Sequence, residues 1–184
     1  MSIETLAVFC GSRSGNNPLY EEHAAELGRL IALSGITLIY GGGNSGIMGA
    51  IANAQLKHGG KVIGVIPEIL IEWEHQHEGL TELLVVEDMH TRKRIMYSKC
   101  DATVLLPGGF GSLDEFFEML TWNQLKIHNK RIGILNTAGF YDHLIVHMKN
   151  LETLGFLYDK LEDRIFIADT PEELFLLLQA GVTD

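Results

Sequence analysis

The chain has 184 residues, of which 46% are hydrophobic and 21% charged, and its formal net charge is −10. This length and composition are typical of a globular protein with one hydrophobic core, so we expect residues 1–184 to form a single domain. The negative charge argues against nucleic acid and acidic membranes as partners, because both bind basic surfaces. A small anionic ligand remains compatible, since it needs only a local positive patch.

The cysteines and the hydropathy exclude further classes of protein. Cys10 and Cys100 have no CxxC spacing, so neither a disulfide scaffold nor a metal site is predicted. The first residues, MSIETLAVFCGS, lack the basic start of a signal peptide. No apolar stretch approaches the roughly 18 residues that a membrane helix needs. We therefore expect a cytoplasmic protein that binds neither a membrane nor a metal ion.

Short β-branched, apolar segments alternate with longer amphipathic ones along the chain. The expected strands are residues 6–10, 36–40, 61–66, 82–86, 102–106, 131–135 and 164–168. The expected helices are residues 18–34, 45–58, 89–99, 112–128, 139–153 and 171–180. Strands that are apolar throughout are typical of parallel sheets covered on both faces. The pattern predicts an α/β fold, a single doubly wound Rossmann-like domain with a mostly parallel sheet of about seven strands and helices on both faces.

Three of the expected helices have N-terminal signals. Asn17 is the expected N-cap of the first helix, with Pro18 at the favoured first helical position. Asp88 lies near the N-cap of the helix at 89–99. The last helix opens with Thr170-Pro171-Glu172-Glu173, which has the form of a capping box.

Glycine-rich loops follow three of the expected strands. GSRSGNN follows residues 6–10, GGGNSGIMG follows 36–40 and PGGFGS follows 102–106. Ligands of open parallel sheets bind outside the carboxyl ends of the strands. Glycine lets the backbone approach a ligand, and the helix that follows offers unpaired amides to an anion. The three loops therefore predict a phosphate site. From the second loop we expect substrate contacts from Gly42, Gly43, Gly46 and Met48.

The second loop has another interpretation. Residues 41–46 match GxGxxG, and Glu68 follows 22 residues after Gly46, as in a dinucleotide-binding fingerprint. The match follows the second strand instead of opening the fold, so NAD binding is the less favoured interpretation. No GxxxxGK[ST] motif occurs, and a P-loop NTPase is not supported.

The segment DMHTRKRIMYSKC (88–100) brings three cations to the start of a helix. Arg92, Lys93 and Arg94 fall in or near its first turn, where positive charges oppose the helix dipole. Successive helical residues are about 100° apart, so the three cannot all face one partner. The simple interpretation is a set of solvated surface charges. Their unfavourable position indicates instead that at least one neutralises an anion at this edge.

Taken together, MHTRKRIMY and PGGFGSLDE resemble the paired MHxRK and PGGxGTxxE motifs of the Lonely Guy (LOG) family. The resemblance extends to GGGNSGIMG and to TWNQLKIHNKRIGILNTAGFYD. Members are cytokinin riboside 5′-monophosphate phosphoribohydrolases, which cleave a nucleoside 5′-monophosphate into free base and ribose 5-phosphate. Many were first labelled lysine decarboxylases. The resemblance implies the same reaction on AMP-like or cytokinin nucleotides, no cofactor, and a homodimer or higher homo-oligomer.

The resemblance also assigns roles to residues. Arg92 and Glu115 match the catalytic arginine and glutamate of the family. Its substrate-binding positions fall on Lys93, Gly108, Gly109, Phe110, Gly111, Ser112, Leu113, Asp114 and Thr121. Glu74 matches a further substrate contact by spacing alone, with Glu78 and Glu82 as nearby competitors. Ser112 stands where the family usually has threonine, which keeps the hydroxyl that a phosphate contact needs.

Glu115 has a structural interpretation beside the catalytic one. A carboxylate next to the anomeric carbon stabilises an oxocarbenium-like ribose and deprotonates the attacking water, while Arg92 anchors the substrate or stabilises its charge. However, Ser112 to Glu115 is itself an S-x-x-E capping box. On this pattern alone the cap is the simpler interpretation, and only the accompanying motifs favour catalysis.

The remaining candidates have structural explanations. His143 and His147 have the i, i+4 spacing of zinc ligands, but no glutamate or third ligand accompanies them. His75 and His77 fall in an expected loop and are interpreted as solvated. The spacing of Leu113, Phe116, Phe117 and Leu120 predicts the core-facing stripe of their helix. Met119 and Trp122 lie partly outside it and are expected at a subunit contact.

Two other functions compete with the hydrolase. One is a non-catalytic carrier of a nucleotide or phosphorylated cofactor, which has no need of a carboxylate beside an anion. The other is decarboxylation with pyridoxal phosphate, for which Lys93 is the suggestive lysine.

Overall fold

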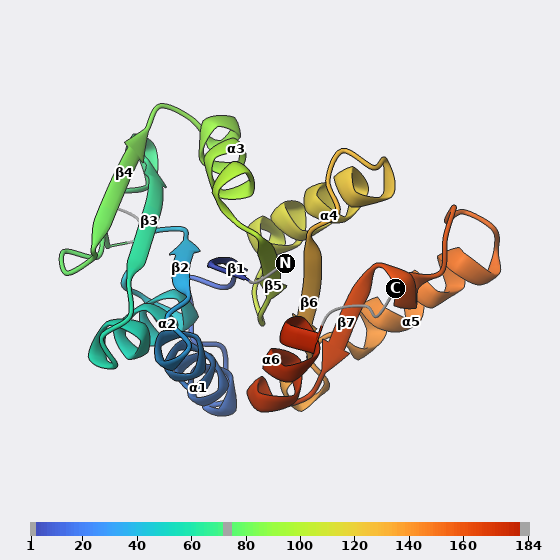
Figure 1. Ribbon diagram of the computed structural model, residues 1–184, viewed down its shortest axis with the longest axis horizontal. Helices are drawn as coiled ribbons and strands as arrows, with labels where there is room; N and C mark the ends of the chain where they lie inside the picture. Colours follow the sequence, from blue (N-terminus) through green and yellow to red (C-terminus); the bar gives the residue numbers. More distant parts are fainter. Residues whose placement is uncertain (1–2, 72–74, 181–184) are drawn as a thin grey trace.

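The computed structural model describes residues 3–71 and 75–180. Seven parallel strands form one sheet in the order β4-β3-β2-β1-β5-β6-β7 (Figure 1). The strands are β1 (Thr5–Phe9), β2 (Thr37–Tyr40), β3 (Val62–Pro67), β4 (Glu82–Val86), β5 (Ala102–Leu105), β6 (Arg131–Leu135) and β7 (Ile165–Ala168). The α/β fold with a doubly wound parallel sheet is confirmed.

Helices cover both faces of the sheet. They are α1 (Leu19–Leu33), α2 (Gly46–Lys57), α3 (Met89–Lys99), α4 (Phe110–Gln124), α5 (Asp142–Thr153) and α6 (Pro171–Ala180). Alternate residues of each strand enter opposite cores, as pleating requires. Leu6 and Val8 join the core under α1, α2 and α6, whereas Ala7 and Phe9 join the core under α3, α4 and α5. No helix within the described ranges is long and apolar enough to cross a membrane.

The strand order places a topological switch point between β1 and β5. From β1 the chain moves outward through β2 and β3 to β4, then returns to pair β5 with the other side of β1. Ligands of such folds bind at the carboxyl ends of the strands beside the switch point, and the loops after β1 and β5 lie at that edge of the sheet. These are two of the three glycine-rich loops.

The capping predictions are mostly confirmed. Asp88 accepts a 2.7 Å hydrogen bond from the amide of Thr91, and Thr170 accepts one of 3.3 Å from the amide of Glu173. Helix α1 begins at Leu19 with Pro18 as N-cap, one residue later than expected. Asn17 still accepts a 3.1 Å hydrogen bond from the amide of Leu19.

The predicted capping box at Ser112 and Glu115 is wrong. Helix α4 begins at Phe110, its N-cap is Gly109 in an extended conformation, and no side chain caps it. Ser112 is therefore inside the first turn, and its hydroxyl lies close enough to Gly108 that a Cβ there would come within 2.2 Å of it. The extended glycine backbone lets the helix start earlier than the serine signal predicts.

The predicted inward face of α4 is also partly wrong. Ser112, Glu115, Phe116, Met119 and Asn123 form the buried stripe, while Phe117 is 37% exposed. Met119 is in the core and not at a surface contact. Hydropathy misplaces the stripe because three polar residues, Ser112, Glu115 and Asn123, occupy it.

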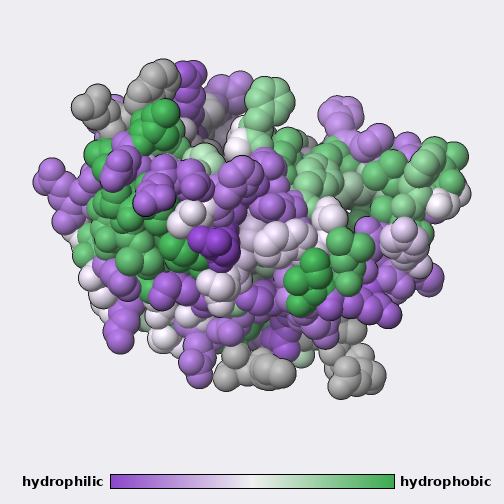
Figure 2. All heavy atoms as spheres, turned by 90° about the horizontal axis from the view of Figure 1, so that it is seen from above, coloured by the Kyte–Doolittle hydropathy of each residue, from purple (hydrophilic) through white to green (hydrophobic). Residues whose placement is uncertain are grey.

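Several apolar side chains reach the surface near α4 and α5. They include Phe117, Leu125, Leu154, Phe156 and Tyr158. Figure 2 shows apolar areas toward its right side, where α4 and α5 lie in Figure 1, and polar residues separate them from the apolar area on the left. This distribution leaves apolar surface available for contact with another molecule.

Candidate active site

The three glycine-rich loops meet at one edge of the sheet, as predicted. The amide of Gly11 donates a 3.0 Å hydrogen bond to the carbonyl of Pro107, and the amide of Met48 donates one of 3.2 Å to the carbonyl of Gly11. Gly46 has a φ of 56°, and a Cβ there would lie 2.4 Å from the backbone of Arg13. Such close packing of backbones explains why these positions are glycines.

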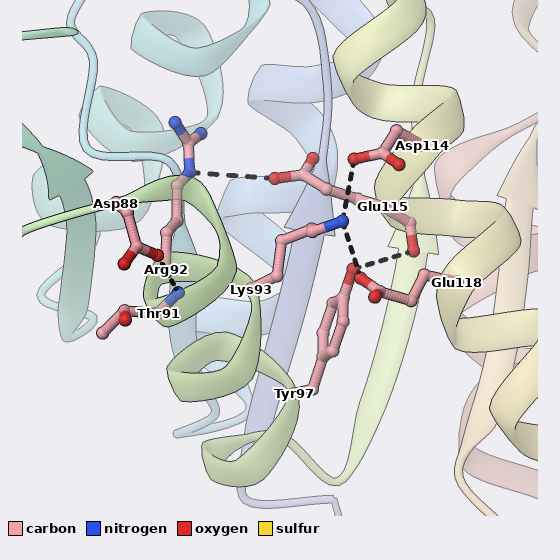
Figure 3. Close-up of polar contacts among 8 residues, drawn as sticks. All are labelled: Asp88, Thr91, Arg92, Lys93, Tyr97, Asp114, Glu115 and Glu118. Atoms are coloured by element: carbon pink, nitrogen blue, oxygen red, sulfur yellow. Dashed lines mark hydrogen bonds and ion pairs between the residues drawn. The ribbon is translucent and has the colours of Figure 1, made fainter. Parts of the chain in front are cut away.

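Arg92 and Glu115 lie together beside this edge. Nε of Arg92 is 3.8 Å from Oε1 of Glu115 (Figure 3). The two residues are 3% and 5% exposed. Arg92 comes from the first turn of α3 and Glu115 from the second turn of α4. Because desolvation makes a buried ion pair costly, a pair of this kind beside a ligand-binding edge indicates a functional site.

Gly41 makes room for the guanidinium of Arg92. A Cβ at position 41 would lie 2.1 Å from Nη2 of Arg92 and 3.1 Å from the terminal methyl of Met48. The second glycine loop therefore packs directly on the arginine. This contact is possible only because residue 41 has no side chain. A dinucleotide-binding loop would need a glycine here to approach its ligand, whereas in this fold the glycine makes room for Arg92.

Lys93 points toward α4. Its Nζ lies 3.0 Å from Oδ2 of Asp114 and 2.9 Å from Oε2 of Glu118 (Figure 3). Burial disfavours the charged form of Lys93, but the bonds to Glu118 and Asp114 outweigh it and raise the pKa of Lys93 above its ordinary value. Arg94 is exposed. The interpretation of the three cations as solvated charges is thus correct for Arg94 and wrong for the other two.

Tyr97 of α3 is hydrogen-bonded to the backbone of Glu115 on α4. Its hydroxyl donates a 3.2 Å hydrogen bond to the carbonyl of Glu115, and its ring packs edge to face on Trp122 at a centroid distance of 5.4 Å. Burial, together with the charges of Glu118 and Glu115, raises the pKa of Tyr97. Sequence reasoning missed Tyr97 and Glu118. The available signal was their i, i+4 spacing, Tyr97 from Lys93 and Glu118 from Asp114, which places each pair on one face of its helix.

The other predicted residues of the third loop are spread along α4. Ser112 is buried, whereas Phe110 is 93% exposed at the first position of the helix. Thr121 lies six residues beyond Glu115, about 9 Å along the helix axis. It lines a groove of about 150 Å³ between α4 and α5. The fold does not bring Thr121 together with Arg92 and Glu115 within one chain.

Histidine and glutamate candidates had mixed outcomes. His77 is 6% exposed, so its interpretation as a solvated residue is wrong. Its ring lies 3.1 Å from Oδ1 of Asn53 and accepts a 3.0 Å hydrogen bond from the amide of Gly79. His75 is exposed, as are His143 and His147 on α5, and Glu78 and Glu82 are exposed too. The prediction for Glu74 lies outside the described residues.

A larger hollow, of about 680 Å³, opens at the amino ends of β5, β6 and β7. Two of its charged groups are hydrogen-bonded to the backbone: Asp101 accepts hydrogen bonds from the amides of Glu4 and Thr5, and Arg131 donates to the carbonyl of Leu178. Arg92 and Glu115 do not line it. The candidate site therefore lies at the opposite edge of the sheet.

Comparison with known proteins identifies the family to which the chain is similar. A family model described as "Possible lysine decarboxylase" matches residues 48–178. The cytokinin riboside 5′-monophosphate phosphoribohydrolase of Rhodococcoides fascians is 43% identical over 89% of this chain and 83% of its own length. The protein LOG7 of Arabidopsis thaliana, named for the same activity, is 41% identical over 96% of this chain and 82% of its own. The probable enzyme LOG6 of Arabidopsis thaliana is 40% identical over 98% and 90%.

Solved structures resemble the fold more distantly. The molybdenum cofactor binding protein of Rippkaea orientalis has a TM-score of 0.74 at 23% identity, over 100% of this chain and 99% of its own. A Moco carrier protein of Chlamydomonas reinhardtii has a TM-score of 0.68 at 18% identity, over 94% and 93%. At these identities the likeness concerns the fold alone.

Proposed function

The chain belongs to the Lonely Guy (LOG) family, and on that premise we propose that it is a nucleoside 5′-monophosphate phosphoribohydrolase. It hydrolyses the N-glycosidic bond of cytokinin riboside 5′-monophosphates or AMP-like nucleotides. The observation that carries this proposal is the buried pair of Arg92 and Glu115 beside the glycine-rich loops at the carboxyl edge of the sheet.

The reaction consumes one water molecule. The bond between C1′ of the ribose and the base nitrogen breaks, its electrons move onto the base, and the ribose passes through an oxocarbenium-like state. The carboxylate of Glu115 stabilises this cation and accepts a proton from the water whose oxygen bonds to C1′. The leaving base gains a proton, so that free base and ribose 5-phosphate result. Arg92, which keeps its positive charge, anchors the substrate beside Glu115.

The phosphate is bound at the start of α4. A helix N-terminus offers unpaired amides and the positive end of the dipole to an anion, and no side chain caps this one. A Cβ at Gly109 or Gly111 would enter open space, so the ligand has room to approach the backbone. Ser112 donates its hydroxyl, as the threonine of the family motif would.

The proposal includes the other residues that the family motif assigns. These are Glu74, Lys93, Gly108, Phe110, Leu113, Asp114 and Thr121, with Gly42, Gly43, Gly46 and Met48 of the second loop. We also propose that residues 1–184 act as one nucleotide-binding domain in the cytoplasm. A homodimer is part of the proposal, supported by the exposed apolar side chains of α4 and of the loop after α5.

The two competing functions have less support. A pure carrier has no need of a carboxylate held next to an arginine at its ligand site. Decarboxylation through a Schiff base requires a free lysine amine, whereas Nζ of Lys93 is held by Asp114 and Glu118.

The test is a substrate panel. The purified protein is incubated with nucleoside 5′-monophosphates that differ in their base, including AMP and an N6-prenylated AMP, and free base and ribose 5-phosphate are measured. We expect equal amounts of both products from at least one nucleotide, and none from the matching nucleosides. Tight binding without release of base would overturn the proposal in favour of the carrier.

A further inference from the structure

Residues 75–77, which include the buried His77, follow the short helix η1 (Glu68–Leu70) and are hydrogen-bonded to the second glycine loop. The amide of His77 donates a 3.0 Å hydrogen bond to the carbonyl of Gly42, and the amide of Asn44 donates one of 2.9 Å to the carbonyl of His75. Gly43 and Gln76 pair between them as an antiparallel bridge. Residues 42–44 are thus held along their length by residues 75–77.

One backbone amide determines the protonation of the His77 ring. The amide of Gly79 can only donate, and it lies 3.0 Å from Nδ1 of His77, so Nδ1 carries no proton. In the neutral ring the proton is then on Nε2, which donates to Oδ1 of Asn53 at 3.1 Å. Nδ2 of Asn53 in turn donates to Oδ1 of Asn44 at 3.1 Å. The chain of hydrogen bonds runs from Gly79 through His77 and Asn53 to the glycine loop.

The surroundings of His77 suit this neutral form. Burial lowers the pKa of His77. Asn53 of α2, which is hydrogen-bonded to the ring, and Asn44 of the glycine loop, which is hydrogen-bonded to Asn53, carry no charge. On its own segment, His75 and Glu78 are exposed.

The loop held in this way continues into the contact with the candidate catalytic arginine. Gly42 follows Gly41, against which the guanidinium of Arg92 packs without room for a Cβ. Tyr40 adds a hydrogen bond of 2.9 Å from its hydroxyl to the carbonyl of Gly43. A displacement of this loop would change the space in which the guanidinium lies, and displacements of about 1 Å cost enzymes up to about a hundredfold in rate.

We propose that His77, together with Asn53, is a positioning residue that holds the glycine loop at residues 41–44 against Arg92 through its neutral ring with the proton on Nε2. The inference rests on the proposed function for its kinetic consequence. The hydrogen-bond network itself is independent of the reaction.

Two substitutions of His77 distinguish the contribution of Nδ1 from that of Nε2. His77→Asn places an acceptor where Nδ1 was and loses the link to Asn53, whereas His77→Gln reaches Asn53 and loses the acceptor for Gly79. We expect His77→Asn to lower kcat/KM by about tenfold to a hundredfold and His77→Gln to retain more activity. His147→Gln, on the exposed side of α5, is the matched control and should behave as wild type. Equal activity of all three variants would overturn the proposal.

Asn53→Ala gives a variant that keeps the histidine and is expected to fold, because position 53 is an exposed helical site where alanine is favourable. It should lower kcat/KM to about the level of His77→Asn, and the double variant should lose no more than either single one. Additive losses would contradict a shared network. A purely structural role would lower the melting temperature while the folded fraction kept the wild-type kcat/KM, which would also overturn positioning.

Nitrogen NMR of the histidine rings tests the network without any turnover. We expect the His77 signals of the wild-type protein at neutral pH to be those of the tautomer protonated on Nε2, and we expect the same tautomer in Asn53→Ala, because the amide of Gly79 still donates to Nδ1. A ring protonated on Nδ1 would overturn the inference. If the protein releases no base from any nucleotide while the tautomer is as expected, the proposed function fails and the network stands.

Discussion

Nε of Arg92 lies 3.8 Å from Oε1 of Glu115, and the two side chains reach each other from different helices on the same face of the sheet. Burying two charges costs several kcal/mol, which their attraction only partly offsets. The pair is therefore expected to serve the ligand more than the fold. Substitutions that keep the size of these side chains should therefore lower activity with little effect on stability.

Glu115→Gln removes the proton acceptor and keeps the size of the side chain. We expect kcat to fall by about 10²-fold to 10⁴-fold, the usual contribution of a general base. The substitution removes no helix cap, because the N-cap residue of α4 is Gly109 and the side chain of Glu115 takes no part in capping. Steady-state release of free base measures the loss, and circular dichroism verifies the fold. Glu22→Gln, at an exposed position of α1, is the control, and unchanged turnover in Glu115→Gln would remove Glu115 from the mechanism.

Gly41→Ala tests the contact between the second glycine loop and Arg92. Gly41 does not have the positive φ that strains other residues, and the atom that a Cβ would meet first, at 2.1 Å, is the end of a flexible arginine. The guanidinium should shift while the fold persists. We expect kcat/KM to fall by about a hundredfold with little change in melting temperature.

A double-mutant cycle with Arg92→Ala shows whether Gly41→Ala acts by displacing the guanidinium of Arg92 or acts on the substrate directly. If Gly41→Ala acts by displacing the arginine, it should cost almost nothing further once Arg92 is alanine. A full additional loss in the double variant would show that Gly41 acts on the substrate directly.

The fold was predictable because its signals are local. Apolar strands such as Ala102–Leu105 and caps such as Asp88 act over a few residues, so the sequence predicts them closely. The order of the strands could not be predicted in the same way, because pairing β1 with β5 depends on contacts between distant residues. Helix α4 begins two residues earlier than expected because glycine backbone conformation outweighs the serine signal.

The sequence predicts which residues belong to the proposed site, but not the contacts that they make. Motif resemblance found Arg92 and Glu115. Hydropathy could not show that Lys93 is held by Asp114 and Glu118, since a cation near the start of a helix is interpreted as solvated until its partner helix is placed. His77 was wrongly interpreted as solvated, because its burial comes from packing against the second glycine loop, which is distant in sequence.

Ser112→Ala tests the phosphate site at the start of α4. Loss of one hydrogen bond to a charged group should cost about 1.5 to 3 kcal/mol, which is at least about tenfold in affinity. We expect the inhibition constant of ribose 5-phosphate to rise by about that factor while that of free adenine stays unchanged. Ser112→Thr, which restores the family's residue, should bind ribose 5-phosphate as the wild type does. An equal loss of adenine affinity would show that Ser112 does not contact the phosphate.

Tyr97 should make the protein sensitive to alkali. Burial, reinforced by Glu118 and Glu115, raises the pKa of Tyr97 above its ordinary value of 10.0, so above that pH the unfolded chain releases a proton that the folded chain keeps. The stability from this group is present below pH 10.0 and is lost as the pH rises. Tyr97→Phe should cost about 1 kcal/mol at neutral pH, through the lost bond to Glu115, but make the free energy of unfolding fall less steeply above about pH 10. Urea denaturation across this range measures both effects, with Tyr158→Phe, at an 84% exposed position, as the control. Parallel pH profiles of Tyr97→Phe and wild type would contradict the assignment of alkaline sensitivity to Tyr97.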